Sequence, residues 1–330
     1  MNRLVIDGCA FAETEFTGIS DEVKNSPLDA FFLTTPGEEF GFTHSLYQMG
    51  KIYNLTDDEN SKLMVARTPD EILKAKELGK KAIIFAFQDP DSIGNDLGKL
   101  RVLYEAGIRV IQMTYNKQNY IGTGCIENHD GGLTDFGKEM LKKMNQLGIV
   151  ADISHTGHMT GLDVLKMSEK PVVFSHAGVD AITPNPRNKT DEELKLLKEN
   201  GGVIGLSSWG PLCWKKEKGK RPTMADYVDH IEYVVDLIGI DHVAFGGDST
   251  LDNNEDKKGL AQQNSSYPAV VKDYNETIGI DPKTRHAEGI IGSWQIDNVV
   301  EELKRRGYSE EDIGKFTGGN FLRVLRENQK

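Results

Sequence analysis

Two histidines stand in the same local sequence. His155 follows the apolar run 149–153 in a Ser-His dipeptide, and His176 follows the run 171–174 in the same way. A helix-length segment, 159–168, separates the two runs. A strand, a helix and a strand in this order place both imidazoles at one edge of a parallel sheet, because such crossovers are right-handed. Two imidazoles at one edge predict either a pair of metal ligands or an acid and a base.

Other reactive side chains stand at the carboxyl ends of further predicted strands. Asp248 ends the run 242–248, Gln88 ends 81–88 and Tyr115 ends 108–115. Residues at these ends of barrel strands face one cavity. Two histidines and an aspartate there are typical of a metal hydrolase, in which the imidazoles hold a cation and the aspartate accepts a proton from water.

Two further residues have open roles. Arg187 lies in the loop Asn-Pro-Arg-Asn-Lys after the strand that ends in His176, where a guanidinium could bind a substrate carboxylate through two hydrogen bonds. Cys9 follows the first predicted strand. It is a candidate metal ligand, a candidate nucleophile, or a small buried residue, which is the usual role of a free cysteine.

The elements that position these residues alternate along the chain. Most of the strands read as continuous apolar runs, as strands buried on both faces do. The eight predicted strands are 4–8, 29–35, 81–88, 108–115, 149–155, 171–176, 202–209 and 242–248, with helical patterns between them. Eight such units in about 250 residues predict an α/β fold, a (β/α)8 TIM barrel. An open doubly wound sheet is the alternative, but no GxGxxG follows the first strand.

The barrel is predicted to carry additional C-terminal helices, at 293–306, 309–316 and 320–328. No linker or repeat divides the sequence, so residues 1–330 are expected to form a single domain. The segments 37–59 and 251–267 are predicted to have the least regular structure. Both follow the carboxyl end of a strand, where barrel active-site loops lie.

Composition limits the partners and the compartment. The 330 residues carry a formal net charge of −12, which argues against nucleic acid and anionic membranes as partners. Three widely spaced cysteines predict no disulfide framework. Neither a signal peptide nor an apolar run long enough for a membrane span is recognised, so a cytoplasmic protein is expected.

Several of these motifs together resemble one family. The runs GGLTDFGKEMLKKMNQLGIVADISHTG, KPVVFSHAG, NPRNKTDEELKLLKENGG and HVAFGGD, and the closing NFLRVLRE, resemble the membrane (renal) dipeptidase family of the amidohydrolase superfamily. The resemblance implies a (β/α)8 barrel and a binuclear zinc dipeptidase. It implies that His155 and His176 bind the second metal, that Asp248 handles protons during attack, and that Arg187 binds the substrate carboxylate.

The chain departs from the family where the first metal is held. The family's first strand ends in Asp-Gly-His-x-Asp, whereas this chain has Asp7-Gly8-Cys9-Ala10-Phe11. Gln88 replaces the bridging glutamate, and Tyr115 replaces a substrate-binding histidine. Gln88 and Tyr115 therefore join Arg187 as candidate substrate-binding residues. At most one zinc ion is expected, on His155 and His176, or no metal at all.

The resulting hypothesis is a dipeptidase-like hydrolase that cleaves an amide C–N bond of a small substrate with a free carboxylate. A metal-independent enzyme acting on a modified amino acid is one alternative, with His155, His176 and Asp248 transferring protons. A non-catalytic protein that binds a small acid is another. Members of the resembled family are often dimers, so a homodimer is an expectation here.

Overall fold

The strands form one parallel sheet that curls into a barrel. The computed structural model describes residues 3–12, 15–35, 41–251 and 263–329. Within them, every strand pairing is parallel, in the order β10-β1-β2-β4-β5-β6-β7-β8-β9, and β3 (Leu63–Val65) pairs with β4 off this path. The other strands are β1 (Ile6–Phe11), β2 (Ala30–Thr34), β4 (Lys81–Phe87), β5 (Ile108–Gln112), β6 (Val150–Asp152), β7 (Val173–Ala177), β8 (Val203–Leu206), β9 (Val243–Phe245) and β10 (Ser249–Thr250).

The two ends of this strand order are joined by the chain itself. Only residues 246–248 separate β9, which pairs with β8, from β10, which pairs with β1. The buried Asp7 carboxylate strengthens the junction, because it accepts the N–H groups of Cys9 (3.0 Å) and Gly247 (2.6 Å). Each of the eight predicted strands overlaps a strand of this ring, which confirms the predicted α/β barrel.

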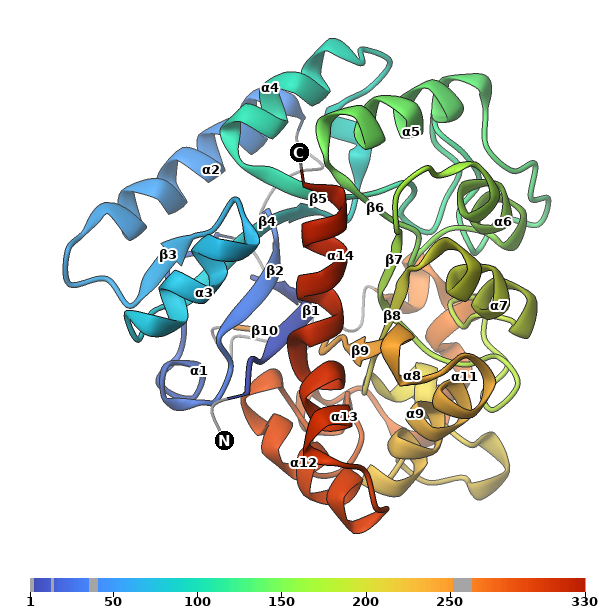
Figure 1. The fold of residues 1–330 in the computed structure, drawn as a ribbon. Coiled ribbons are helices and arrows are strands. Elements are labelled where there is room, and N and C mark those ends of the chain that lie inside the picture. Colours follow the sequence, from blue (N-terminus) through green and yellow to red (C-terminus); the bar gives the residue numbers. More distant parts are fainter. Residues whose placement is uncertain (1–2, 13–14, 36–40, 252–262, 330) are drawn as a thin grey trace.

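Helices surround the barrel, and Figure 1 shows α14 crossing in front of its strands. The helices are α1 (Asp21–Asn25), α2 (Phe42–Asp57), α3 (Pro69–Glu77), α4 (Gly98–Ala106), α5 (Asp135–Leu147), α6 (His158–Met167), α7 (Asp191–Asn200), α8 (Gly210–Cys213), α9 (Met224–Ile238), α11 (Pro268–Ile278), α12 (Ile296–Arg305), α13 (Glu310–Gly314) and α14 (Asn320–Asn328). The last three confirm the predicted C-terminal helices. None of the described helices is both long and apolar enough to span a bilayer.

The helix starts follow local sequence chemistry. Thr68 and Thr190 each accept the backbone N–H three residues later, and a glutamate at that position bonds back to the threonine N–H. Such capping boxes satisfy N–H groups that have no partner within the helix. They fix where α3 and α7 begin, and therefore where the preceding loops end.

The barrel interior is filled, and α14 closes one end of it. Inward-facing strand residues pack with Phe321, Leu322, Val324 and Leu325 of α14, and the rings of Phe32 and Phe321 lie 5.1 Å apart. The strand residues in this cluster include Ile6, Ala30, Phe32, Ala82, Ile84, Ala86, Val110, Val150, Val173, Val203 and Ala244. Since α14 covers the amino ends of the strands, a site built from the strands lies at their carboxyl ends.

The prediction of little regular structure at 37–59 is wrong for most of that segment, because α2 occupies Phe42–Asp57. The buried positions of α2 recur at helical spacing, but two of the four, Ser45 and Gln48, are polar. An apolar stripe was therefore hard to recognise. Of the other such segment, 251–267, residues 252–262 lie outside the described residues.

Candidate functional site

The two histidines singled out by the sequence meet at the carboxyl end of the barrel. His155 follows β6 by three residues and His176 lies near the end of β7. Their Nε2 atoms are 2.9 Å apart, and both side chains are buried. The predicted placement at neighbouring strand ends thus brings the imidazoles into direct contact.

Each imidazole is oriented through its other nitrogen. His155 Nδ1 lies 2.8 Å from Asn116 Oδ1, and His176 Nδ1 lies 2.8 Å from Ser175 Oγ. The Ser175 hydroxyl donates to a carboxylate oxygen of Asp152, so its Oγ accepts from His176. An amide oxygen likewise accepts from His155. With a proton on each Nδ1, both Nε2 atoms present lone pairs.

The Asp152 carboxylate organises both Ser-His dipeptides. Its Oδ1 accepts the hydroxyl of Ser154 (2.6 Å) and the backbone N–H groups of Ser154 (2.9 Å) and Ser175 (3.1 Å). The repeated serine is therefore a support for the histidines. Sequence reasoning missed Asp152, although a carboxylate inside the apolar run Ile149–Ile153 was a usable signal, since a buried charge needs partners.

Both imidazoles are neutral at physiological pH. Burial, reinforced by the nearby Arg187 charge, lowers the pKa of His155 well below its ordinary range. Burial also lowers the pKa of His176, to about 4. Two neutral imidazoles whose lone pairs face each other at 2.9 Å repel one another unless a cation lies between or beside them.

Asp248 and Cys9 lie on the other side of His176. The donor atoms of Cys9, His176 and Asp248 all lie within 4.8 Å of one another. Cys9 Sγ is 3.7 Å from Asp248 Oδ1, and Gln88 Nε2 donates to Cys9 Sγ at 2.8 Å. Burial would raise the pKa of Asp248, but His176 and the guanidinium groups of Arg285 and Arg187 outweigh it and hold that pKa below its ordinary value. Asp248 is therefore an ionised carboxylate.

Backbone strain coincides with the site. Asn116 (φ 60°) and Asp248 (φ 52°) are the non-glycine residues with positive φ in the described chain. Such conformations are costly for residues other than glycine and persist where the surroundings enforce them. Both residues contact the site, since Asn116 holds His155 and Asp248 faces Cys9.

Tyr115 lies against His155, with the two rings stacked at a centroid distance of 4.5 Å. Its hydroxyl shares a hydrogen bond with Tyr267. Burial raises the pKa of Tyr115 well above its ordinary value, so the group stays a neutral hydroxyl. Tyr267, which precedes α11, is the last residue of the segment 251–267, which was predicted to follow a strand's carboxyl end, but no single side chain of that segment was identified from the sequence.

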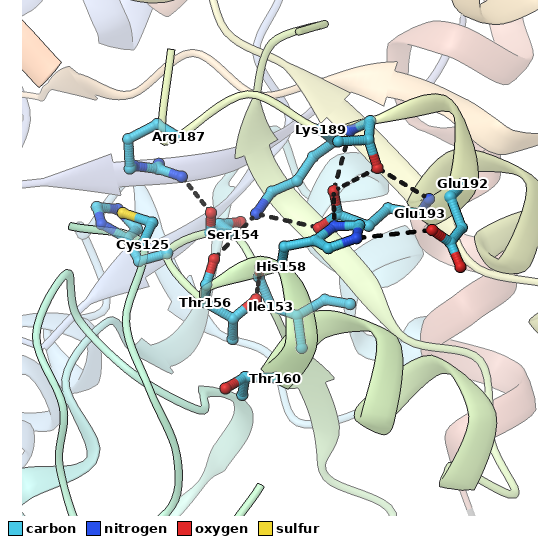
Figure 2. A network of polar contacts seen from close by, with 12 residues as sticks. Cys125, Ile153, Ser154, Thr156, His158, Thr160, Arg187, Lys189, Glu192 and Glu193 are labelled. Atoms are coloured by element: carbon cyan, nitrogen blue, oxygen red, sulfur yellow. Dashed lines mark hydrogen bonds and ion pairs between the residues drawn. The ribbon is translucent and has the colours of Figure 1, made fainter. Parts of the chain in front are cut away.

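Arg187 is buried beneath the two histidines. Its Nη1 donates to the Ser154 carbonyl, as Figure 2 shows, and its Nη2 donates to the His176 carbonyl at 3.1 Å. Its exposed fraction is 1%, and its Nε has no hydrogen-bond partner within the described residues. Arg187 therefore both supports the strand ends and retains free N–H donors.

A second buried cation lies beside Arg187. In Figure 2, Lys189 extends toward the backbone of Thr156, while Glu193 lies between Lys189 and His158. Lys189 Nζ is 3.4 Å from the Thr156 carbonyl and 3.9 Å from Glu193, and His158 contacts Glu193 at 3.2 Å. This network was not predicted from the sequence, because its members come from a loop and two different helices. It holds the loop after β6 on α7.

Comparison with known proteins agrees with this architecture. A sequence profile of the membrane dipeptidase family, peptidase family M19, matches residues 20–281 and 276–330. The dipeptidase verJ of Clonostachys rogersoniana is 29% identical over 283 residues, which are 85% of this chain and 64% of that protein. The dipeptidase aclJ of Aspergillus oryzae is 30% identical over 249 residues, 75% of this chain and 51% of that protein. The chain thus spans between about half and two thirds of these curated relatives.

A solved structure extends the likeness over the whole chain. An amidohydrolase from Pseudomonas aeruginosa superposes with a TM-score of 0.86 at 31% sequence identity, covering 99% of this chain and 97% of that one. The family profile covers nearly all of the sequence, and its match includes both histidines, Arg187 and Asp248. The chain therefore belongs to the membrane dipeptidase family, peptidase family M19.

Proposed function

We propose that this protein is a one-metal hydrolase that cleaves the amide bond of a dipeptide or a similar small substrate with a free carboxylate. The observation that carries the proposal is the contact between His155 and His176. Their Nε2 lone pairs face each other at 2.9 Å, and both rings are neutral. A bound cation turns this repulsive contact into a favourable one.

The donors at this point suit a zinc ion. Imidazole nitrogen, carboxylate oxygen and thiolate sulfur are the ligands that zinc takes in proteins, and His176, Asp248 and Cys9 offer them within 4.8 Å of one another. His155 adds a second imidazole beside His176. A zinc ion held there supplies Lewis-acid activation of water at neutral pH.

A second ion is not part of the proposal. Where the family places its first-metal ligands, this chain has Cys9 and Phe11, and Gln88 stands in place of the bridging glutamate. The Phe11 ring lies 5.4 Å from the Arg285 guanidinium carbon, so the position offers a cation–π contact instead of a ligand. The neutral amide of Gln88 lacks the negative charge with which a carboxylate bridges two cations.

Arg187 is assigned to the substrate carboxylate. A guanidinium has five N–H donors, and the described bonds use one on each Nη. The remaining donors, including the buried Nε, can take a carboxylate in a two-point contact. Because Arg187 also donates to the carbonyls of Ser154 and His176, a carboxylate bound there lies close to the histidines.

Asp248 is assigned to proton handling. It is ionised, so one carboxylate oxygen accepts a proton from the attacking water and delivers it to the leaving amine. Tyr115 is held as a hydroxyl beside His155, where it can donate a hydrogen bond to a substrate carbonyl. Gln88, whose amide nitrogen already donates to Cys9, shapes the same wall of the site.

Metal content and hydrolysis test this proposal together. The protein is prepared without a polyhistidine tag, and its zinc is measured by elemental analysis alongside His155→Ala and His176→Ala. A panel of dipeptides and N-acyl amino acids is then assayed with zinc added. About one ion per chain, lost in both variants, together with amide hydrolysis supports the proposal.

Two results would contradict the proposal. No bound metal would direct attention to metal-independent proton transfer by His155, His176 and Asp248. Bound metal without turnover on any substrate in the panel would favour a protein that only binds a small acid. A His230→Ala control separates loss of metal from general damage. His230 is also buried, but it contacts Val179 and Thr183 instead of the other histidines.

A further inference from the structure

The surroundings of Cys9 are polar, which is unusual for a buried free cysteine. Its exposed fraction is 2%, yet its sulfur contacts the amide of Gln88 and the carboxylate of Asp248. Cys213 is the contrast within this chain. It is also buried, but within the described part of the chain its sulfur has hydrogen bonds to the backbone carbonyls of Ser208 and Trp209 alone, both at 3.6 Å. Cys213 thus behaves as a small packing residue, whereas Cys9 faces the reactive groups.

We propose that the Cys9 thiolate is a ligand of the metal ion, together with His176 and Asp248. This inference rests on the one-metal site proposed above. It assigns to the first strand a sulfur ligand in place of the histidine and aspartate that the resembled family has there.

The separation of the Cys9 and Asp248 donor atoms fits one tetrahedral ion. With zinc–sulfur bonds of about 2.3 Å and zinc–oxygen bonds of about 2.0 Å, the sulfur and oxygen ligands of a tetrahedral ion lie about 3.5 Å apart. Cys9 Sγ and Asp248 Oδ1 are 3.7 Å apart. Cys9 comes from β1 and Asp248 from the segment after β9. These two parts of the barrel are tied together by the Asp7 bond to the Gly247 N–H and by the Asp248 N–H to Cys9 carbonyl bond of 2.9 Å. His176 reaches the same point from β7.

The charges also balance. A thiolate and a carboxylate together carry two negative charges, which one divalent cation neutralises, so neither of these two charges is left without compensation. Gln88 fits this arrangement because its Nε2–H points at the sulfur at 2.8 Å. A hydrogen bond from a neutral amide stabilises and orients a thiolate ligand. A carboxylate at position 88 would place a third negative charge there.

A sulfur ligand has a consequence for metal choice. Thiolates favour zinc and cobalt over the oxygen-preferring magnesium and manganese ions. We therefore expect manganese to compete poorly with zinc for this site.

Cobalt substitution tests the inference without depending on activity. The metal-free protein is titrated with Co²⁺, and a sulfur-to-cobalt charge-transfer band in the near ultraviolet is expected to saturate at about one ion per chain. Cys9→Ser is expected to lose this band, and the matched control Cys213→Ser to keep it. Cobalt binding that shows only ligand-field bands, or a band that survives Cys9→Ser, would overturn the inference, as would no cobalt binding.

A second measurement does not need the variant to fold. Zinc-edge X-ray absorption of the wild-type protein is expected to show one sulfur neighbour at about 2.3 Å, and a shell of nitrogen and oxygen only would refute the assignment. The result separates from that of the hydrolase proposal. Sulfur ligation without turnover keeps Cys9 as a ligand and removes the hydrolase, whereas turnover without sulfur ligation does the reverse.

Discussion

Replacing Arg187 with methionine is expected to reduce stability as well as substrate binding. Arg187 is 1% exposed, and its guanidinium donates to the carbonyl of Ser154, which precedes His155, and to the carbonyl of His176 itself. Methionine has similar length and flexibility and fills the space, so the cavity contribution to the loss is small. The change therefore removes two hydrogen bonds from a charged donor and leaves two buried carbonyl groups without that partner.

The magnitude follows from those two bonds. A hydrogen bond from a charged donor contributes about 1.5–3 kcal/mol, so the pair contributes about 3–6 kcal/mol. Removing a buried cation returns part of this, because its desolvation no longer has to be offset. We expect Arg187→Met to lower the free energy of unfolding by about 2–4 kcal/mol. That is a large part of the roughly 5–15 kcal/mol typical of a folded protein.

Urea unfolding of the metal-free protein measures this loss, and KM on a hydrolysed substrate reports the contact with the substrate carboxylate. Arg109→Met is the matched control. Arg109 donates to the carbonyls of Arg67, Tyr104 and Ile108, but it lies at the amino end of β5, away from the site. We expect the control to be destabilised with KM unchanged. If Arg187→Met unfolds within about 0.5 kcal/mol of wild type, the reasoning from its carbonyl contacts is refuted.

Two further predictions concern charged groups. Glu193→Gln leaves the Lys189 ammonium buried without its counter-charge and is expected to lower the free energy of unfolding, measured in urea, by about 3–5 kcal/mol. Lys189→Met should lower it less, since Glu193 keeps its contacts with Thr190 and with His158. Equal losses in the two variants would contradict this reasoning. Burial would raise the pKa of Asp226. The hydrogen bonds that this carboxylate accepts, the strongest effect being that of Lys218, outweigh burial and lower the pKa to about 2. Its contribution to stability is therefore complete above about pH 4 and is lost as the pH falls toward 2, and Asp226→Asn should show a smaller acid loss in urea titrations.

The barrel was predictable because its strands are buried on both faces. Such strands appear in the sequence as continuous apolar runs, for example Ile83–Phe87 and Val172–Phe174. These runs can be recognised without knowing which elements the strands pack against. The Thr-initiated starts of α3 and α7 were equally local signals. The short strand β3 and helix α2 were missed, because α2 buries polar residues and β3 has only three residues. Their formation depends on tertiary contacts that no local pattern reveals.

The site was predictable where its residues end strands. His155, His176 and Asp248 could be placed at one end of the barrel from sequence order alone, and the structure brings them together there. The supports were not predictable in this way. Asn116 orients His155 across thirty-nine positions of sequence, and the partners of Lys189 come from separate elements. Only the fold shows which polar side chain faces which imidazole.

The structure also explains why a repeated Ser-His dipeptide suits this site. One carboxylate, Asp152, accepts from both serines, and Ser175 passes the orientation on to His176 through its Nδ1. Arg187 binds the carbonyls of Ser154 and His176, so the same side chain assigned to the substrate carboxylate also holds the backbone that carries both metal-ligand candidates. A carboxylate bound to the remaining donors of Arg187 shares the guanidinium with those two carbonyls. Substrate binding and the spacing of the histidines are therefore physically coupled through Arg187, and metal affinity measured with and without a bound carboxylate should differ.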